Sequence, residues 1–443
     1  MLDVIRNLRR DAGERDDVAR LAKTCRQLLS ERGESNSRAI AGAALDCWRR
    51  LDPDGMHRFF RVLASDFDPD PGEVLRLAEH YAVSRSPDNL VKLAKAAEPP
   101  RQELLRRLNR AEGGTGAIVQ MRQRLLDKLR HDRSLKAVDA DFQHLLSSWF
   151  NPGFLRLVQV DWSSPASLLE RIIAHEAVHE IDGWADLRRR LEPDRRCFAF
   201  FHPVLPDEPL IFVEIALLPQ MPAAIAPLLA RDVPQPIDPS GFKVAVFYSI
   251  SNCQPGLRGI NLGNFLIKQV AERLQREFPT LKTFCTLSPI PGFAGWLTKL
   301  DPDAIGAPRM RTTDRRALQD ALAALRTRHG ADLAGLLPGG AAVPGGTADD
   351  QADRNALSAL CAHYLVHRTA TEAPEADPVA RFHLNNGARL QRINPAADLS
   401  RKGLRQSFGM MVNYLYDLDR IEACHEKFMH GEVAASRAVL GLI

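Results

Sequence analysis

The sequence predicts an α+β multidomain protein, with an N-terminal all-α helical bundle over residues 1–150 and a mixed α/β domain over residues 151–443. Two observations predict this division. Apolar residues recur at helical spacing in the first part, whereas runs of strand length, rich in β-branched and aromatic residues, follow in the second. Asn151-Pro152-Gly153 lies between them and marks the boundary.

The helical bundle is predicted from four apolar stripes, each of which fits one face of a helix. The stripes are Val18, Leu21, Ala22, Cys25, Leu28 and Leu29; Leu104, Leu105 and Leu108; Ile118, Met121, Leu125 and Leu129; and Phe142, Leu145, Leu146 and Trp149. Pro- and Gly-containing breaks separate the predicted helices. No stripe carries clustered catalytic residue types, so the bundle is interpreted as a packing or subunit-contact domain.

The second part contains four strand candidates and a hairpin signal. The strands are expected at Cys197–His202, Leu210–Ala216, Val244–Ser251 and Thr283–Leu287. Asn386-Gly387, flanked by Val379–Leu384 and Arg389–Ile393, predicts a β-hairpin. Residues 334–353 are rich in Gly, Pro and Ala and are expected to form a mobile surface loop.

The composition, 45% hydrophobic and 26% charged, is that of a soluble globular chain. Basic and acidic residues nearly balance, 59 against 55, and no long basic run occurs, so no nucleic-acid partner is predicted. No run of about 18 apolar residues is present, so no membrane segment is predicted. Seven dispersed cysteines without a C-x-x-C pair, and an N-terminus without an apolar signal core, favour a cytoplasmic protein.

The stretch after Val244 has the pattern of a strand, a glycine loop and a helix. The loop Gln254–Gly263 carries three glycines, and apolar residues recur at helical spacing from Leu262 onward. Unpaired backbone N–H groups at a helix N-terminus bind anions, and the guanidinium of Arg258 suits a phosphate. An ordinary βα connection, with glycines for turn geometry, explains the same pattern. From these features alone both interpretations stay open.

His175-Glu176-Ala177-Val178-His179 matches the metalloprotease pattern H-E-x-x-H and is expected on a helix. At that spacing both imidazoles would hold zinc, with Glu176 as general base. The longer zinc motif requires Gly at 182 and His at 185, but the sequence has Asp182 and Ala185. The motif is therefore interpreted as structural, with no metal predicted.

Four blocks of the second part resemble the malonyl-CoA decarboxylase family. They are FFHPVLPDEPLIFVEIAL from Phe200, YSISNCQPGLRGINLGNFLIK from Tyr248, TLSPIPGF from Thr286 and RFHLNNGARLQRIN from Arg381. They follow in order and span most of residues 150–443, whereas the helical part resembles that family's helical domain only in kind. The resemblance implies that residues 151–443 form a catalytic domain with a GNAT-like acyltransferase fold, and that the enzyme is a homotetramer.

The resemblance also places the CoA portion of the substrate. The GNAT phosphate motif R/Q-x-x-G-x-G/A maps onto Arg258, Gly259, Ile260, Asn261, Leu262 and Gly263, and the implied CoA-binding loop extends to Asn264. Asn261 replaces a glycine of the general pattern. Its side chain either weakens the backbone cradle for the diphosphate or adds a donor that faces the acyl chain, and the sequence leaves both open.

The implied reaction converts malonyl-CoA to acetyl-CoA and CO2 through a thioester enolate that is then protonated. It involves no redox change, so no cofactor is expected beyond the CoA of the substrate. The resemblance points to Ser288, His383 and Tyr416 as active-site residues. His383 is expected to donate the proton with Ser288 as its hydrogen-bonded partner, although these two roles are exchangeable, and Tyr416 orients the pair or lines the pocket.

Taken alone, the same residues have simpler explanations. Ser288 precedes a proline and fits a turn, His383 fits a surface position beside the predicted hairpin, and Tyr416 fits a core position. Two other functions also stay open. One is a GNAT-type acyltransferase that uses a CoA ester to modify an amine, and the other is a non-catalytic protein that binds CoA esters and docks a partner.

Overall fold

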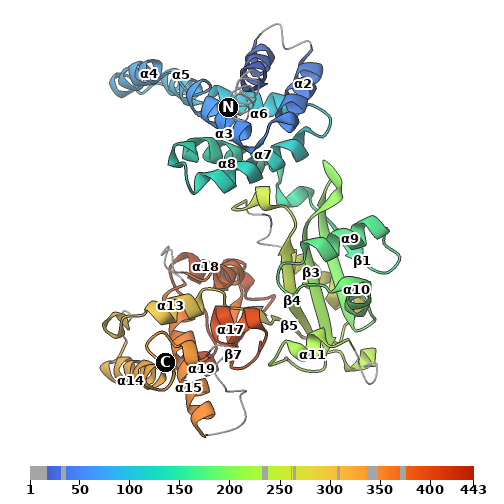
Figure 1. Ribbon diagram of the computed structural model, residues 1–443, viewed down its shortest axis with the longest axis vertical. Helices are drawn as coiled ribbons and strands as arrows, with labels where there is room; N and C mark the ends of the chain where they lie inside the picture. The colour runs from blue at the N-terminus through green and yellow to red at the C-terminus, as the bar shows by residue number, and fades with distance from the viewer. Residues whose placement is uncertain are drawn as a thin grey trace, which may run out of the picture. The chain divides into compact units, whose positions relative to one another are not determined.

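The structure is a computed structural model, and it describes residues 17–30, 36–231, 238–260, 262, 266–306, 310–336, 348–369 and 376–443. Its contacts divide the chain into two compact units (Figure 1). The helical unit comprises residues 1–156 with two short later segments, 201–210 and 253–262. The sheet unit comprises residues 157–200, 211–252 and 263–443. The second short segment of the helical unit contains most of the predicted CoA-binding loop.

The helical unit has a helix for each predicted stripe. Its helices are residues 17–29, α2 (Ser37–Arg50), α3 (Pro53–Ser65), α4 (Pro71–Val83), α5 (Pro87–Ala97), α6 (Pro100–Leu108), α7 (Gly114–Leu129) and α8 (Lys136–Trp149). Most residues of the four stripes are buried, so their apolar faces form the core of this unit. The helical prediction is confirmed.

Several breaks that contain proline are helix starts. Asp52 accepts a hydrogen bond from the N–H of Gly55 at 2.6 Å, and Pro53 occupies the first helical position of α3. Ser86 accepts from the N–H of Asn89 at 3.2 Å, with Pro87 opening α5. A capping side chain satisfies a backbone donor that has no helical partner, and proline needs no such partner.

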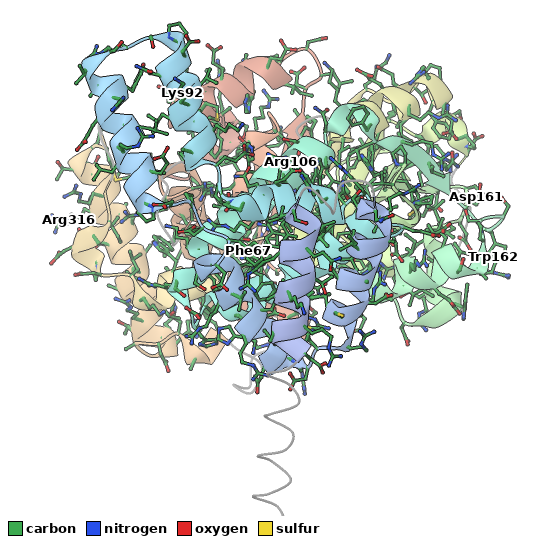
Figure 2. The ribbon with its side chains drawn as sticks, turned by 90° about the horizontal axis from the view of Figure 1, so that it is seen from above. Phe67, Lys92, Arg106, Asp161, Trp162 and Arg316 are labelled. Atoms are coloured by element: carbon green, nitrogen blue, oxygen red, sulfur yellow. The ribbon has the colours of Figure 1, made fainter. Side chains whose placement is uncertain are left out.

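Helices α4 and α5 form a hairpin that buries no residue of its own. Leu75, Val83, Leu90 and Val91 are exposed apolar side chains on it. Figure 2 shows Lys92 on this hairpin, at a distance from Phe67, which is buried among the other helices of the unit. The hairpin is therefore the part of the helical unit with the least apolar contact to the rest of that unit.

The sheet is mixed and has eight strands in the order β1-β2-β3-β4-β5-β8-β6, with β7 paired to β8. The strands are β1 (Arg156–Val160), β2 (Arg195–His202), β3 (Leu205–Leu218), β4 (Val244–Asn252), β5 (Thr283–Thr286), β6 (Ser288–Pro289), β7 (Arg389–Asn394) and β8 (Met411–Tyr416). The four predicted strands correspond to β2, β3, β4 and β5. The α+β class is confirmed.

The helices of the sheet unit connect these strands (Figure 1). They are α9 (Ala166–His175), α10 (Gly183–Arg190), α11 (Ala226–Leu229), α12 (Leu266–Glu277), α13 (Phe293–Lys299), α14 (Thr312–His329), α15 (Ala348–His367), α16 (Pro378–Asn385), α17 (Arg401–Ser407), α18 (Ile421–Met429) and α19 (Arg437–Leu440). Of the expected loop 334–353, residues 334–336 form a 3-10 turn and residues 348–353 lie in α15, so these ends are helical. Residues 337–347 lie outside the described residues.

Strands β4 and β5 separate beyond Phe247. They pair in parallel from Val244 to Phe247, after which β4 continues to Asn252 beside β3 alone. The register with β3 shifts at the same place, because Ile215 pairs with Phe247 but Glu214 pairs with Ser249. One residue of β4 is therefore extra, as in a β-bulge. Among the described residues, the end of β4 beyond Phe247 has no β5 residue paired with it, and it is here called the open edge of β4.

The predicted hairpin at Asn386-Gly387 is wrong. Val379–Leu384 lies in helix α16, which Asp377 caps by accepting from the N–H groups of Val379 and Ala380 at 3.0 and 2.9 Å. Gly387 has φ of +77° and follows the end of that helix. The same Asn-Gly pair that suits a hairpin turn therefore ends a helix here. His383 consequently lies on a helix and not at a strand edge.

Candidate active site

The structure brings Ser288, His383 and Tyr416 together in one hydrogen-bonded chain in the sheet unit. Nε2 of His383 lies 3.0 Å from Oγ of Ser288, and Nδ1 lies 2.8 Å from the hydroxyl of Tyr416. The three residues come from β6, α16 and β8. All three are buried. The imidazole thus lies between two hydroxyl groups, and each of its nitrogens has a partner.

The sheet holds the serine in place. Oγ of Ser288 lies 2.8 Å from Oγ1 of Thr286, which also accepts from the backbone N–H of Tyr414 at 3.2 Å. Ser288 pairs with Val412 of β8, and Asn413 donates to the carbonyl of Thr286 at 2.7 Å. The serine hydroxyl is therefore fixed by backbone pairing and by the threonine.

The imidazole is held by stacking and by the cap of its helix. The rings of His383 and Tyr414 stack with centroids 4.6 Å apart. The carboxylate of Asp377, which caps α16, also accepts from the N–H of Gly292 at 2.9 Å. Gly292 follows the Ser-Pro-Ile-Pro segment that begins at Ser288. One buried carboxylate thus ties the start of the histidine helix to the segment after the serine.

Burial sets the protonation of these groups. Because a buried group is disfavoured in its charged form, burial lowers the pKa of His383 to about 3 and raises the pKa of Tyr416 well above its usual range. His383 is therefore neutral near pH 7. In a neutral imidazole one nitrogen donates and the other accepts, so protons can be arranged along the chain from Tyr416 to Ser288 or in the reverse direction. The site is suited to moving a proton between its two ends.

The predicted CoA-binding loop is only partly described. Arg258, Gly259, Ile260 and Leu262 belong to the helical unit, whereas Asn261, Gly263 and Asn264 lie outside the described residues. The question raised by Asn261 therefore stays a prediction. Gly259 has φ of +81°, a conformation that favours glycine.

Helices α7 and α8 hold this loop through its carbonyl groups. The buried guanidinium of Arg122 donates to the carbonyls of Gly256 and Arg258 at 2.8 and 2.7 Å, and it pairs with Asp139 at 2.9 Å. The amide of Gln143 donates to the carbonyl of Gly259 at 3.1 Å. Gly256 has no room for a side chain, because a Cβ there would lie 2.0 Å from the carbonyl oxygen of Val119.

Only the first residue of the H-E-x-x-H motif lies on a helix, which corrects the sequence interpretation. Helix α9 ends at His175, and Glu176 has an extended conformation. The carboxylate of Glu176 accepts from the N–H groups of Val178 and His179 at 2.8 and 2.7 Å. Among the described residues, no three His, Cys, Asp or Glu side chains are grouped as ligands for a metal ion.

Sequence reasoning missed several residues that support these sites. Arg122 is one basic residue of an otherwise apolar helix face, and nothing in the sequence links it to a loop more than a hundred residues later. Thr286 lies inside the TLSPIPGF block, so its position two residues before Ser288 on a strand was an available signal. Asp377 was also detectable, since Asp-Pro commonly opens a helix.

A buried neutral imidazole between two hydroxyls, supported by a mixed sheet, is an arrangement with which an α+β enzyme can transfer a proton. Family comparison agrees with this class. Residues 153–443 match the C-terminal domain of malonyl-CoA decarboxylase, and residues 67–150 match its N-terminal domain. The chain belongs to the malonyl-CoA decarboxylase family.

Individual relatives support this membership. The chain is 35% identical over 403 residues to a mitochondrial malonyl-CoA decarboxylase of Anser anser anser, covering 86% of this chain and 78% of the relative. It is 37% identical over 361 residues to that of Mus musculus, covering 80% and 73%.

Solved structures extend the match to the fold. The malonyl-CoA decarboxylase of Rhodopseudomonas palustris is 46% identical with a TM-score of 0.83, covering 95% of this chain and 98% of that one. The Agrobacterium vitis enzyme is 47% identical with a TM-score of 0.79, covering 95% and 99%. Within the described part of the chain, no helix is long and apolar enough to cross a membrane.

Proposed function

We propose that this chain is a carboxy-lyase that converts malonyl-CoA to acetyl-CoA and CO2. Membership of the malonyl-CoA decarboxylase family supports the activity. The observation that carries the chemistry is the contact between Ser288 and His383, whose Oγ and Nε2 atoms lie 3.0 Å apart in a buried site. A decarboxylase of this kind needs a proton for the α-carbon after CO2 has left, and this pair is placed to supply one.

Proton supply depends on the charge of the substrate. Burial keeps His383 neutral in the free protein. A bound malonyl carboxylate would place a negative charge beside the imidazole, which favours its protonated form. After the C–C bond breaks, the electron pair moves into the thioester as an enolate, and His383 donates its proton to the α-carbon directly or through Ser288. Tyr416 orients the imidazole through Nδ1.

The enolate oxygen requires hydrogen-bond donors that are already in place. The open edge of β4 beyond Phe247 offers backbone N–H groups next to the strand that leads to Ser288. Such donors are effective because charge develops on the oxygen only as the bond breaks. Removal of one of them typically costs about 100- to 1000-fold in rate.

The loop Arg258 to Asn264 is the proposed site for the CoA diphosphate. Arg122 and Gln143 hold the carbonyls of residues 256, 258 and 259 against α7 and α8, and these bonds fix the backbone of the loop. The sequence β4, loop, α12 and parallel β5 is also the arrangement from which we propose a GNAT-like fold. The reaction balances without redox chemistry, so we propose no cofactor.

The assembly and location are also proposals. The exposed apolar residues of the α4–α5 hairpin are suited to contact another copy of the chain, which fits the homotetramer implied by the family resemblance. All seven cysteines are free thiols, in keeping with a cytoplasmic protein, although the two animal relatives are named as mitochondrial. Sedimentation analysis of the wild-type protein and of a Leu90→Glu, Val91→Glu variant tests the hairpin contact.

Incubation with carboxyl-labelled malonyl-CoA tests the function. The expected result is labelled CO2 together with one equivalent of acetyl-CoA. Transfer of an acyl group to an amine, without labelled CO2, would identify an acyltransferase. Tight CoA-ester binding without any product by mass spectrometry would identify a binding protein, and either result would overturn the proposal.

A further inference from the structure

The carboxylate of Glu176 accepts hydrogen bonds from the backbone of its own segment and also from two serine side chains of β4. Oγ of Ser249 lies 2.8 and 2.7 Å from its two oxygens, and Oγ of Ser251 donates to Oε2 at 3.1 Å. Both serines lie in β4, beyond the last residue that pairs with β5. Ser251 in turn accepts from the N–H of Ala177 at 3.1 Å.

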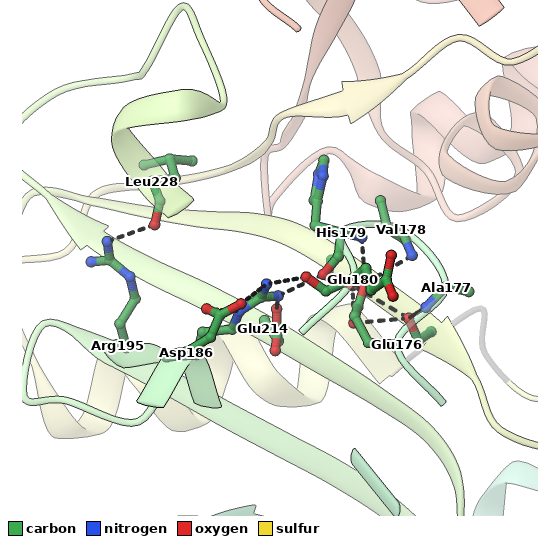
Figure 3. A network of polar contacts seen from close by, with 12 residues as sticks. Glu176, Ala177, Val178, His179, Glu180, Asp186, Arg195, Glu214 and Leu228 are labelled. Carbon is green, nitrogen blue, oxygen red and sulfur yellow. Dashed lines mark hydrogen bonds and ion pairs between the residues drawn. The ribbon is translucent and has the colours of Figure 1, made fainter. Parts of the chain in front are cut away.

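Residues 176–180, here called the clamp segment, are held by hydrogen bonds from several elements of the sheet unit. Figure 3 shows Glu176 among Ala177, Val178 and His179, with the hydrogen bonds dashed. Lys402 donates to the carbonyls of residues 177 and 178 at 2.8 Å each. Arg190 donates to the carbonyls of residues 179 and 180 at 2.9 and 3.0 Å. The clamp segment is therefore a fixed support.

Arg190 also links this support to β3. Its guanidinium pairs with the buried Glu214 at 2.8 Å and with Asp186 at 3.1 Å. Glu214 lies directly opposite Ser249 in the β3–β4 register. The clamp segment is thus anchored to both strands at the place where β4 leaves β5.

Because of the bulge, Phe247 and Ser249 of β4 point to opposite faces of the sheet. Paired residues of neighbouring strands point to the same face of a sheet, whereas successive residues of one strand point to opposite faces. Glu214 and Ile215 are successive, so their partners Ser249 and Phe247 face opposite ways. Phe247 faces the ring of Tyr416, with centroids 6.5 Å apart. Ser249 faces Glu176 on the other side.

We propose that Glu176 is a positioning residue that holds the open edge of β4 in register for catalysis from the face opposite to His383. The inference rests on the proposed function, because it assumes that backbone groups of this edge contact the thioester. Beyond Phe247, β4 pairs with β3 but not with β5, so its position depends on other contacts as well. The hydroxyls of Ser249 and Ser251 supply such contacts through their bonds to a charged acceptor. The glutamate of the H-E-x-x-H motif thereby acquires a role that involves no metal.

Glu176→Gln tests the proposal, with Glu170→Gln as the matched control. Glu170 lies on the exposed side of α9, the helix that precedes Glu176, so its variant removes an equal charge away from the serines of β4. For Glu176→Gln we expect kcat to fall about 10- to 100-fold with KM for malonyl-CoA little changed, since small misplacement of reacting groups has effects of this size. Ser249→Ala should reproduce the loss, and the double variant should be no slower than the slower single variant, because both remove one contact.

Amide hydrogen exchange provides a readout that does not depend on activity. Residues 248–252 should exchange faster in Glu176→Gln than in the wild type or Glu170→Gln. A Glu176→Gln protein that exchanges faster or melts lower but keeps wild-type kcat would make the contact merely structural and would overturn the proposal. Stoichiometric zinc, lost from Glu176→Gln together with activity, would overturn it in favour of a metal site. If the wild type releases no CO2 from malonyl-CoA, the proposed function fails while the exchange result still decides whether the clamp exists.

Discussion

Two regions assigned to the same substrate are built in opposite ways. At the proposed acyl end, the reacting groups are side chains, and Ser288, His383 and Tyr416 are buried and bonded to one another. At the proposed diphosphate end, the site is a loop, and its backbone is held by side chains that donate to the loop carbonyls, above all Arg122. Chemistry at the acyl end should therefore depend on individual side chains, whereas affinity at the other end should depend on support from α7 and α8.

This difference gives the two regions separate kinetic signatures. Groups that act only as charge develops alter kcat, whereas groups that bind the unchanging CoA portion alter KM. Substitutions in each region should therefore be separable in one assay of CO2 release.

The largest expected effects follow from removing the proton-transfer pair. Ser288→Ala and His383→Ala should each lower kcat about 100- to 10,000-fold, because a positioned acid or base contributes that much. CoA binding, measured by calorimetry, should stay close to that of the wild type. A wild-type rate in either variant contradicts the assignment of roles.

A smaller effect is expected at the loop. Arg122→Ala leaves the carbonyls of Gly256 and Arg258 without their donor, so KM for malonyl-CoA should rise about tenfold or more, as for the loss of a hydrogen bond to a charged group. Arg124→Ala, an exposed arginine on the same helix, is the matched control and should leave KM unchanged. An unchanged KM in Arg122→Ala would mean that the loop does not bind CoA.

Tyr416→Phe should have a modest effect, because it removes one hydrogen bond but keeps the ring. The hydroxyl lies 2.8 Å from Nδ1 of His383, and its loss should reduce kcat about tenfold. KM should change little. A large rise in KM would instead place Tyr416 in the binding surface.

A further effect, on stability and not on rate, is expected in the pH dependence of unfolding. The pKa of His383 is lowered by burial from 6.5 to about 3, so below pH 6.5 the unfolded chain binds a proton that the folded protein does not. The stability that neutral His383 contributes is therefore fully present above pH 6.5, and it is lost progressively as the pH falls toward 3. Thermal unfolding from pH 7 to 4 should show a shallower decline for His383→Gln than for the wild type. Equal slopes would show that folding does not lower the pKa of His383.

Elements with strong periodic patterns were predictable from the sequence, whereas an element decided by its helix cap was not. The strands β2 to β5 and the helical stripes carry strong periodic signals, and each was predicted within a few residues or extended by the structure. The residues 379–384 carry a strand-like composition, but Asp377-Pro378 starts a helix and Gly387 ends it, so local capping outweighed the hairpin signal. His383 was identified from the family blocks, although the secondary structure predicted for it was wrong.

The contacts that support the two sites could not be predicted from the sequence. The bonds from Arg122 to the loop and from Glu176 to Ser249 join residues far apart in the chain, and no periodicity encodes such pairs. The H-E-x-x-H spacing also suggested one helical face, but α9 ends at the first histidine, and the glutamate turns to β4. Local patterns therefore predicted the elements, whereas the contacts between them required the fold.

The most direct test of these separate roles is to measure kcat and KM of His383→Ala and Arg122→Ala side by side with carboxyl-labelled malonyl-CoA. We predict that His383→Ala lowers kcat and keeps KM, whereas Arg122→Ala keeps kcat and raises KM. Loss of the same constant in both variants, with both proteins folded, would contradict it.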